Sequence, residues 1–213
     1  MKQNLRICCY GSSSSKTPEA YTSEAFSLGR ILAERDHVCV NGGGAHGCMG
    51  AMNDGCDSSG GTIHAIIHEM FVVDGAEYLD GKKAKTRHSL TVTTGPNLKE
   101  RKEKLVENCD AIIVLPGGTG TFDELWEMTA QRALGMWKKP IVCVSIDGYY
   151  EPFREMMRRA EDDKLLHCDA SALLSFASTS EEAVDLVERL LAADQGPRGG
   201  YRAVGRRRRL LAP

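Results

Sequence analysis

Short apolar runs alternate with longer amphipathic stretches along the chain. The runs at 111–115 (AIIVL) and 141–145 (IVCVS) are apolar at successive positions and rich in β-branched residues. This pattern is typical of strands that are buried on both faces of a parallel sheet. The pattern predicts a weak strand near Ala172–Phe176 and six clearer ones: Leu5–Tyr10, His37–Asn41, Thr62–Ile67, Ser89–Thr94, Ala111–Leu115 and Ile141–Ser145.

Helices are predicted between these strands, because apolar residues there recur at helical spacing. In the first of them Ala25, Leu28 and Leu32 share one face, and we expect Thr17 at the N-cap with Pro18 at the first helical position. The predicted helices are Pro18–Arg35, Cys48–Ser58, Leu98–Asn108, Thr121–Gly135, Tyr150–Asp162 and Ser180–Ala193. The alternation predicts an α/β fold with a doubly wound, mostly parallel sheet between two layers of helices.

The size and composition favour a single globular domain. The chain has 213 residues, of which 42% are hydrophobic and 26% charged, which excludes wholesale disorder. It has no apolar run long enough to cross a bilayer, and its first residues do not resemble a signal peptide. We expect one domain over residues 1–194, with a basic, disordered tail over 195–213.

The net charge of −2 hides an asymmetry between body and tail. Six arginines and no acidic residue follow Asp194, so residues 1–195 carry 21 basic against 29 acidic side chains. An acidic body gives no reason to expect nucleic-acid binding. The tail is compatible with a solvated segment, a localisation signal or a contact to a polyanion.

The eight cysteines contain no CxxC pair, and several of them lie in apolar runs. We expect them to be reduced, in a cytoplasmic protein. No metal site is expected. His64, His68 and Glu69 do not have the HExxH order and fall on a predicted strand and its exit.

Three segments rich in glycine or serine follow predicted strands: residues 11–15, 42–50 and 116–121. Ligands of an open parallel sheet bind outside the carboxyl ends of its strands, so the three are expected at one edge. A helix is predicted directly after 116–121, and its free N–H groups would suit a phosphate, with Thr119 and Thr121 adding hydroxyls. The alternative is that these glycines only form tight turns.

Two common nucleotide motifs are missing. GxxxxGK[ST] is absent, and no lysine follows the glycines, which disfavours NTP hydrolysis. The first turn also lacks GxGxxG, which disfavours dinucleotide binding.

Glu124 has two interpretations. Thr121 and Glu124 have the spacing of a capping box, with Thr121 as N-cap, which is a purely structural role. The same position directs a carboxylate towards the predicted phosphate edge, where the helix N-terminus favours its ionised form as a base or electrostatic stabiliser. Arg101 and Lys102 lie early in a helix, which is mildly unfavourable for cations unless an anion is near, although a solvated, salt-bridged face is the simpler interpretation.

Three motifs together resemble the LOG family of cytokinin riboside 5′-monophosphate phosphoribohydrolases. They are GGGxxGxMG at 42–50, Glu100-Arg101-Lys102, and PGGTGTFDE at 116–124, and the resemblance extends from about Arg6 to Leu166. It implies a Rossmann-like fold and hydrolysis of the N-glycosidic bond of a purine nucleoside 5′-monophosphate to the free base and ribose 5-phosphate. No cofactor is implied, and members form homodimers, some of which assemble further.

The resemblance also implies roles for individual residues. Arg101 and Glu124 would be the catalytic pair. The contacts to substrate would come from Lys102, Gly117, Gly118, Thr119, Gly120, Thr121, Asp123 and Thr129. The edge of the pocket would be formed by Ser12, Gly43, Gly44 and Met49.

Two other function classes remain open. A nucleotide sensor or a molybdenum-cofactor carrier could use the same glycine turns, because a fold does not fix a function. A carrier needs no carboxylate beside a ribose, so the pairing of Arg101 with Glu124 favours the enzyme. A structural protein that binds nucleic acid through its tail is supported only by the arginines. The chain departs from the family pattern at Leu98-Lys99 and over 68–89, which leaves the preferred base open between an N6-prenylated adenine, plain adenine and another purine.

Overall fold

The computed structural model describes residues 4–72 and 87–194. The predicted tail at 195–213 therefore lies outside the described residues, as does part of the divergent segment after His68. The elements are β1 (Arg6–Tyr10), α1 (Glu19–Glu34), β2 (Val38–Asn41), α2 (Gly47–Ser58), β3 (Thr62–His68), the 3₁₀ helix η1 (Glu69–Phe71), β4 (Ser89–Thr93), α3 (Lys99–Val106), β5 (Ala111–Val114), α4 (Thr119–Ala133), β6 (Ile141–Val144), the 3₁₀ helix η2 (Ile146–Gly148), α5 (Glu151–Asp162), α6 (Ala170–Leu173), β7 (Ser175–Ala177) and α7 (Ser180–Asp194).

The strands form one parallel sheet in the order β4-β3-β2-β1-β5-β6-β7. The central strand β1 pairs with β2 on one side, through Ile7 opposite Cys39, and with β5 on the other, through Ile7 opposite Ala111. The chain therefore reverses its direction of winding between β1 and β5, and such a switch point is where open α/β sheets bind ligands. The predicted doubly wound, Rossmann-like fold is confirmed.

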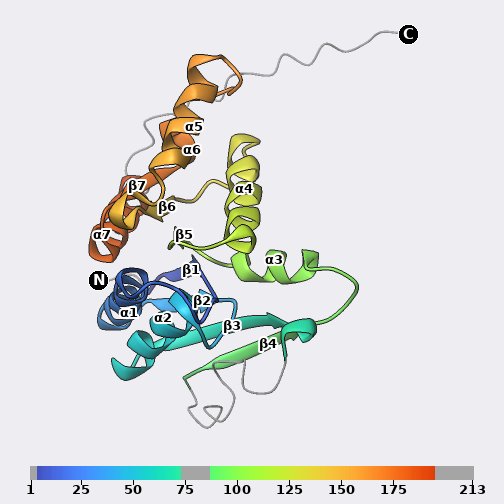
Figure 1. Cartoon of the computed structure of the whole chain (residues 1–213), viewed down its shortest axis with the longest axis vertical. Helices are drawn as coiled ribbons and strands as arrows, with labels where there is room; N and C mark the ends of the chain where they lie inside the picture. Colours follow the sequence, from blue (N-terminus) through green and yellow to red (C-terminus); the bar gives the residue numbers. More distant parts are fainter. Residues whose placement is uncertain (1–3, 73–86, 195–213) are drawn as a thin grey trace.

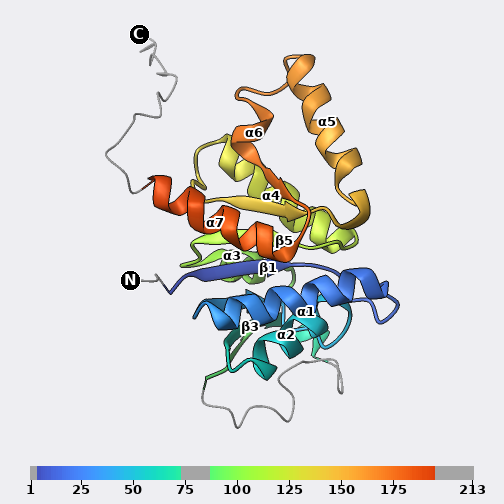
Figure 2. The same ribbon diagram turned by 90° about the vertical axis from the view of Figure 1, so that its left-hand side faces the viewer.

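Helices cover both faces of the sheet (Figures 1 and 2). α1, α2 and α7 lie on one face, and α3 to α6 lie on the other. The strands supply both cores by simple alternation: Ile7 and Cys9 point into the first core, and Cys8 and Tyr10 into the second. This period of two explains why the buried strands are apolar at every position.

Most predicted elements agree with the structure to within a few residues, but the predicted N-cap of the first helix was wrong. α1 has Pro18 at its N-cap, and the Thr17 hydroxyl donates to Ser14 O (2.7 Å) instead of capping the helix. The weak seventh strand is real, but it lies at Ser175–Ala177, behind the short helix α6. No helix within the described ranges is long and apolar enough to span a membrane.

Candidate active site

Three turns meet at the carboxyl ends of the strands, as predicted. They are the serine turn (residues 11–15) after β1, the GGG turn (42–50) after β2, and the PGG turn (116–121) after β5. Ser12 joins the other two, because its N–H donates to Pro116 O (3.0 Å) and its carbonyl accepts from Met49 N (3.1 Å). The Cys48 thiol also donates to Pro116 O (3.5 Å). The turns thus form one connected rim above the switch point.

The PGG turn leaves its N–H groups free. The backbone N–H groups of residues 118 to 121 donate to no acceptor among the described residues. A Cβ atom at Gly118 or Gly120 would have no atom within 4 Å, and neither residue has a positive φ. Protein packing therefore does not require glycine at these two positions. Close approach of a ligand to the backbone does explain why glycine occupies both positions.

Gly117 is different, because it is packed inside the protein. A Cβ atom there would overlap the side chain of Thr121 and lie 3.0 Å from Ser12 N. Thr121 is itself buried, whereas Thr119 is exposed at the start of α4. Of the two predicted hydroxyl donors, only Thr119 is thus presented to solvent.

The predicted capping box at Thr121 and Glu124 was wrong. α4 begins at Thr119, Gly118 is its N-cap in an extended conformation, and the Phe122 N–H donates to Gly118 O (3.0 Å). Thr121 therefore lies in the first turn of the helix, where its side chain packs over Gly117. Glu124 consequently lies in the second turn, where its carboxylate does not reach the helix N-terminus. The role of Glu124 in a capping box is therefore excluded.

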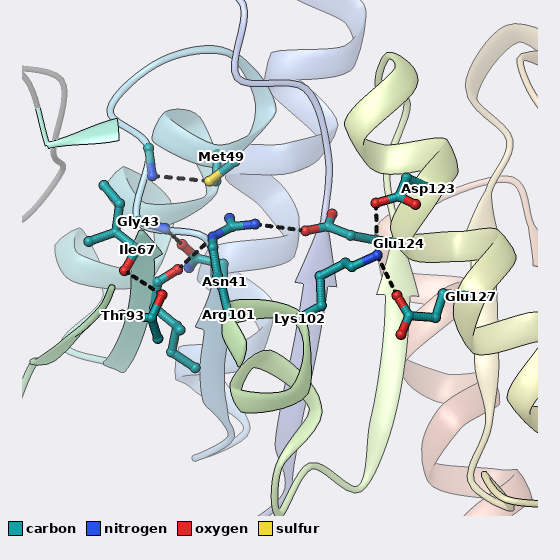
Figure 3. A network of polar contacts seen from close by, with 12 residues as sticks. Asn41, Gly43, Met49, Ile67, Thr93, Arg101, Lys102, Asp123, Glu124 and Glu127 are labelled. Carbon is teal, nitrogen blue, oxygen red and sulfur yellow. Dashed lines mark hydrogen bonds and ion pairs between the residues drawn. The ribbon is translucent and has the colours of Figure 1, made fainter. Parts of the chain in front are cut away.

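The Glu124 carboxylate is instead paired with Arg101 (Figure 3). Arg101 Nη1 donates to Glu124 Oε1 (3.1 Å), and Arg101 Nε donates to the Ile66 carbonyl of β3 (3.2 Å). The guanidinium lies against Gly42, where an added Cβ atom would overlap Nη2, and 5.7 Å from the centre of the Phe71 ring. The side chains of Arg101 and Glu124 are only 10% and 14% exposed. The GGG turn thus makes room for an arginine that fixes a carboxylate across the end of the sheet.

Burial raises the pKa of Glu124, while the adjacent Arg101 acts in the opposite direction. The helix N-terminus was expected to favour the ionised form, but removal from water has the larger effect. A carboxylate with a raised pKa is a stronger base than an ordinary glutamate. Such a perturbed carboxyl group next to a charge partner is typical of functional sites.

Lys102, the neighbour of Arg101, contacts α4 through two other carboxylates (Figure 3). Its Nζ lies 3.1 Å from Asp123 Oδ2 and 2.6 Å from Glu127 Oε2, and these contacts raise its pKa. A hollow of about 140 Å³ beside these residues is also lined by Tyr10 and Glu124. α3 and α4 are therefore joined by two adjacent ion-pair groups at the same end of the sheet.

The four residues predicted at the pocket edge also lie at this rim. Gly43 has a φ of 76°, and its N–H donates to Asn41 Oδ1 (2.9 Å). The Gly44 N–H donates to Met49 Sδ (3.0 Å), and Met49 Sδ lies beside the Gly42 position that Arg101 approaches. Ser12 joins the turns as described above.

Thr129 does not lie with the other predicted residues. It is buried on α4, and its hydroxyl donates to Leu125 O (2.7 Å) inside the same helix. Two tyrosines at the end of η2 were not predicted to lie at the site: the Tyr149 hydroxyl donates to Gly117 O of the PGG turn, and the Tyr150 hydroxyl donates to Leu115 O just before it. Tyr149 lines a hollow of about 240 Å³ together with Ser12, Lys16, Tyr21 and Gly117. Two consecutive tyrosines after a buried strand were the only available signal.

The described residues contain no group of three His, Cys, Asp or Glu side chains that could hold a metal ion. His64 is occupied by Arg6 Nη2 (2.8 Å) and Thr91 Oγ1 (3.1 Å), and His68 Nδ1 accepts from Met70 N (3.2 Å). The two histidines considered from the sequence therefore have structural partners.

Several known proteins resemble this chain in sequence. A family profile described as "possible lysine decarboxylase" matches residues 49–187. Cytokinin riboside 5′-monophosphate phosphoribohydrolase LOG of Oryza sativa subsp. japonica is 33% identical over 187 residues, which cover 84% of this chain and 71% of that protein. LOG5 of Arabidopsis thaliana, with the same activity in its name, is 30% identical over 186 residues, covering 86% and 77%.

Similar solved structures include carriers. The molybdenum cofactor binding protein of Rippkaea orientalis has a TM-score of 0.62 at 17% identity and covers 90% of this chain and 99% of its own. The Moco carrier protein of Chlamydomonas reinhardtii has a TM-score of 0.63 at 22% identity and covers 89% and 99%. At these identities the likeness establishes the fold alone.

Proposed function

Because this chain belongs to the LOG family, we propose that it hydrolyses the N-glycosidic bond of a purine nucleoside 5′-monophosphate. The products would be the free base and ribose 5-phosphate. The substrate class is an N6-substituted adenine nucleotide of the cytokinin type, or AMP itself. The proposed reaction uses no cofactor.

The observation that carries the proposal is the position of the Arg101–Glu124 pair next to an open anion site. The free N–H groups of the PGG turn would bind the 5′-phosphate, with Thr119 adding a hydroxyl. Glu124 follows on the same helix, so a phosphate on the turn would bring the ribose towards its carboxylate. Binding of a remote phosphate is an effective way to position a reacting sugar.

The chemistry requires a group of this kind. Water oxygen forms a bond to C1′ and gives up a proton as the C1′–N9 bond breaks, the bonding electrons leave with the base, and the base takes up a proton. Positive charge develops on the ribose during this step, as in other glycoside hydrolyses. Ionised Glu124 would stabilise that charge and orient the water, while Arg101 would hold the carboxylate in place. We propose further contacts to substrate from Lys102 and Asp123, whereas the buried Thr129 hydroxyl is already bonded to Leu125 O.

Carriage of a phosphorylated cofactor is the alternative, because molybdenum-cofactor carriers share the fold. A carrier needs an anion site but not a buried carboxylate beside it. Burial of Glu124 opposes its ionisation and so costs free energy. Binding of a phosphorylated cofactor gives no reason for that cost. The arrangement therefore favours the hydrolase.

Glu124→Gln tests the proposal. Glutamine retains an oxygen that can accept from Arg101, so folding should be near normal, while activity should fall at least ~10²-fold through loss of the charge. The control is Glu155→Gln, the same change at an exposed carboxylate of α5, which should keep full activity. Base release from N6-isopentenyladenosine 5′-monophosphate is measured by chromatography. Equal activity of the two variants would contradict a catalytic Glu124.

We also propose a homodimer in a reducing, cytoplasmic setting. Seven of the eight cysteines are buried as free thiols, which suits such a compartment. Exposed apolar side chains on and just after α4 would suit a contact between two copies: Phe122, Trp126, Leu134 and Met136. Sedimentation of the purified protein tests the dimer.

A further inference from the structure

Three successive carbonyl groups at the exit of β5 all accept hydrogen bonds from the scaffold. Leu115 O accepts from the Tyr150 hydroxyl (2.8 Å), and Pro116 O accepts from Ser12 N (3.0 Å). Gly117 O accepts from the Tyr149 hydroxyl. The carbonyls are thus held on the protein side of the PGG turn, while the N–H groups after them remain free.

In a planar trans peptide the C=O and N–H groups point in opposite directions. A donor that fixes the Gly117 carbonyl therefore also fixes the direction of the Gly118 N–H, away from that donor. Gly118 is exposed, and a Cβ atom there would have open space around it, so local packing does little to fix this peptide plane. Among the described residues, the Tyr149 hydroxyl is the hydrogen-bond donor to the carbonyl of this peptide.

We propose that Tyr149 is a positioning residue that orients the Gly118 N–H for binding the phosphate of the nucleotide. The inference rests on the proposed function, since it assigns a role within the same anion site. Tyr149 acts through the backbone and is distinct from the Arg101–Glu124 pair, which belongs to α3 and α4.

The surroundings of Tyr149 suit a fixed donor. Its ring packs edge-on against Tyr21 (5.6 Å between centres) and Tyr150 (5.0 Å), which holds its direction. The sharp turn before it, with Asp147 at a φ of 50° and Gly148 at 75°, brings two consecutive tyrosines to the PGG turn. Burial raises the pKa of Tyr149, so the hydroxyl keeps its proton and remains a donor.

Tyr150 provides a matched control within the same turn. Its hydroxyl also donates to a carbonyl at the exit of β5, that of Leu115. The nitrogen of that peptide belongs to Pro116, which has no hydrogen to present to a ligand. Tyr149→Phe and Tyr150→Phe thus each remove one hydroxyl that donates to a peptide carbonyl at the exit of β5. Only Tyr149→Phe affects a peptide whose N–H lies in the anion site.

The test measures binding, so it does not depend on whether the protein is a hydrolase. Affinities for AMP and for adenosine are measured by calorimetry for both variants in the Glu124→Gln background, where turnover is not expected to consume AMP. Tyr149→Phe should weaken AMP binding by roughly tenfold, the effect of impairing one hydrogen bond to an anion, and leave adenosine binding unchanged. Tyr150→Phe should change neither affinity, but it should lower the melting temperature, because it leaves a buried carbonyl without a donor.

A loss confined to AMP and to Tyr149→Phe supports the inference, since a general structural defect would weaken both ligands. Unchanged AMP affinity in Tyr149→Phe would overturn it, and so would an equal loss of AMP and adenosine. An equal loss of AMP binding in Tyr150→Phe would also contradict it. A parent protein that binds AMP no better than adenosine would overturn the anion site itself, and this inference with it.

Discussion

The two ends of the strands form two edges of the sheet that differ in how their backbone N–H groups are bonded. At the amino ends of the strands, backbone donors are matched by side chains. Leu5 N donates to His37 Nδ1 (3.3 Å), and Ile63 N donates to His88 Nδ1 (3.3 Å). Each imidazole then meets a carboxylate through Nε2, Glu188 for His37 (3.0 Å) and Asp57 for His88 (2.9 Å). This edge is closed by the protein itself.

At the carboxyl ends, the same fold leaves donors open. The N–H groups at 118–121 have no acceptor within the described ranges, although the carbonyls just before them all have donors. Buried polar groups are normally hydrogen-bonded within the protein. The N–H groups at the start of α4 are not, so they are available to a ligand. The difference shows that the proposed site lies where the scaffold holds the backbone firmly without using its N–H groups.

Displacing Arg101 should damage the open edge most. An alanine at Gly42 would overlap the end of the Arg101 side chain and displace it. Gly42→Ala should therefore separate Arg101 from Glu124 and lower kcat/KM by about 10²-fold, and the melting temperature should also fall because Glu124 loses its buried partner. Arg101→Lys should give a similar loss, because it keeps the charge but not the planar fork. Wild-type activity in both variants would show that the pair is not needed.

Opening the closed edge should affect stability and not activity. His37 is buried, and His37→Ala would leave Leu5 N without an acceptor and remove the Glu188 contact. We expect a loss of about 2–3 kcal/mol in the free energy of unfolding, with kcat/KM unchanged under conditions where the variant is folded. Denaturant unfolding and steady-state kinetics measure the two quantities. A fall in kcat/KM comparable to that of Gly42→Ala would show that the two edges are not independent.

Adding a methyl group at the open edge should raise stability and weaken substrate binding. Gly120 lies in the first turn of α4 with open space around its Cβ position. Gly120→Ala should raise the free energy of unfolding by up to about 1 kcal/mol, because alanine is the better helix former. The added methyl group should at the same time raise the KM for the monophosphate several-fold. Higher stability with an unchanged KM would indicate that no ligand approaches this turn.

The pH dependence should show the smallest effect. Burial raises the pKa of Glu124, so its ionised form is lost at a higher pH than in an ordinary glutamate as the solution is acidified. The acid limb of kcat/KM should therefore lie above the usual carboxyl range. The raised pKa also means that the folded state binds this proton more tightly than the unfolded state. Protonation of Glu124 should thus favour folding while activity falls.

An acid limb in the ordinary carboxyl range would contradict the importance of burial at Glu124. In the Glu124→Gln variant the residual activity should lose this limb altogether. A pH–rate profile of both proteins provides the comparison.

The sequence predicted the sheet and the meeting of its three turns because those features follow from local patterns. Runs such as AIIVL identify a buried strand, and a parallel sheet places every strand exit at one edge. The proximity of Arg101 to Glu124 followed only through the resemblance to the LOG family. Nothing in the local pattern of either helix indicates which carboxylate an arginine on another helix will contact.

The errors at the site have a common physical cause. A capping box is defined by spacing alone, and spacing did not show that α4 would start at Thr119 with Thr121 packed over Gly117. The contribution of Tyr149 was equally hidden, because it depends on a hydroxyl reaching a carbonyl 32 residues earlier in the chain. Both features depend on contacts of single side chains, and no periodic pattern encodes them.

Release of the base is the most direct test of the proposed function. The purified protein is incubated with AMP and N6-isopentenyladenosine 5′-monophosphate, and with the two corresponding nucleosides, and free base and ribose 5-phosphate are followed by chromatography. We predict release from at least one monophosphate, in equal amounts of base and ribose 5-phosphate, and none from the nucleosides. Saturable binding of the monophosphates without any release of base would contradict the hydrolase and indicate a carrier or sensor on the same fold.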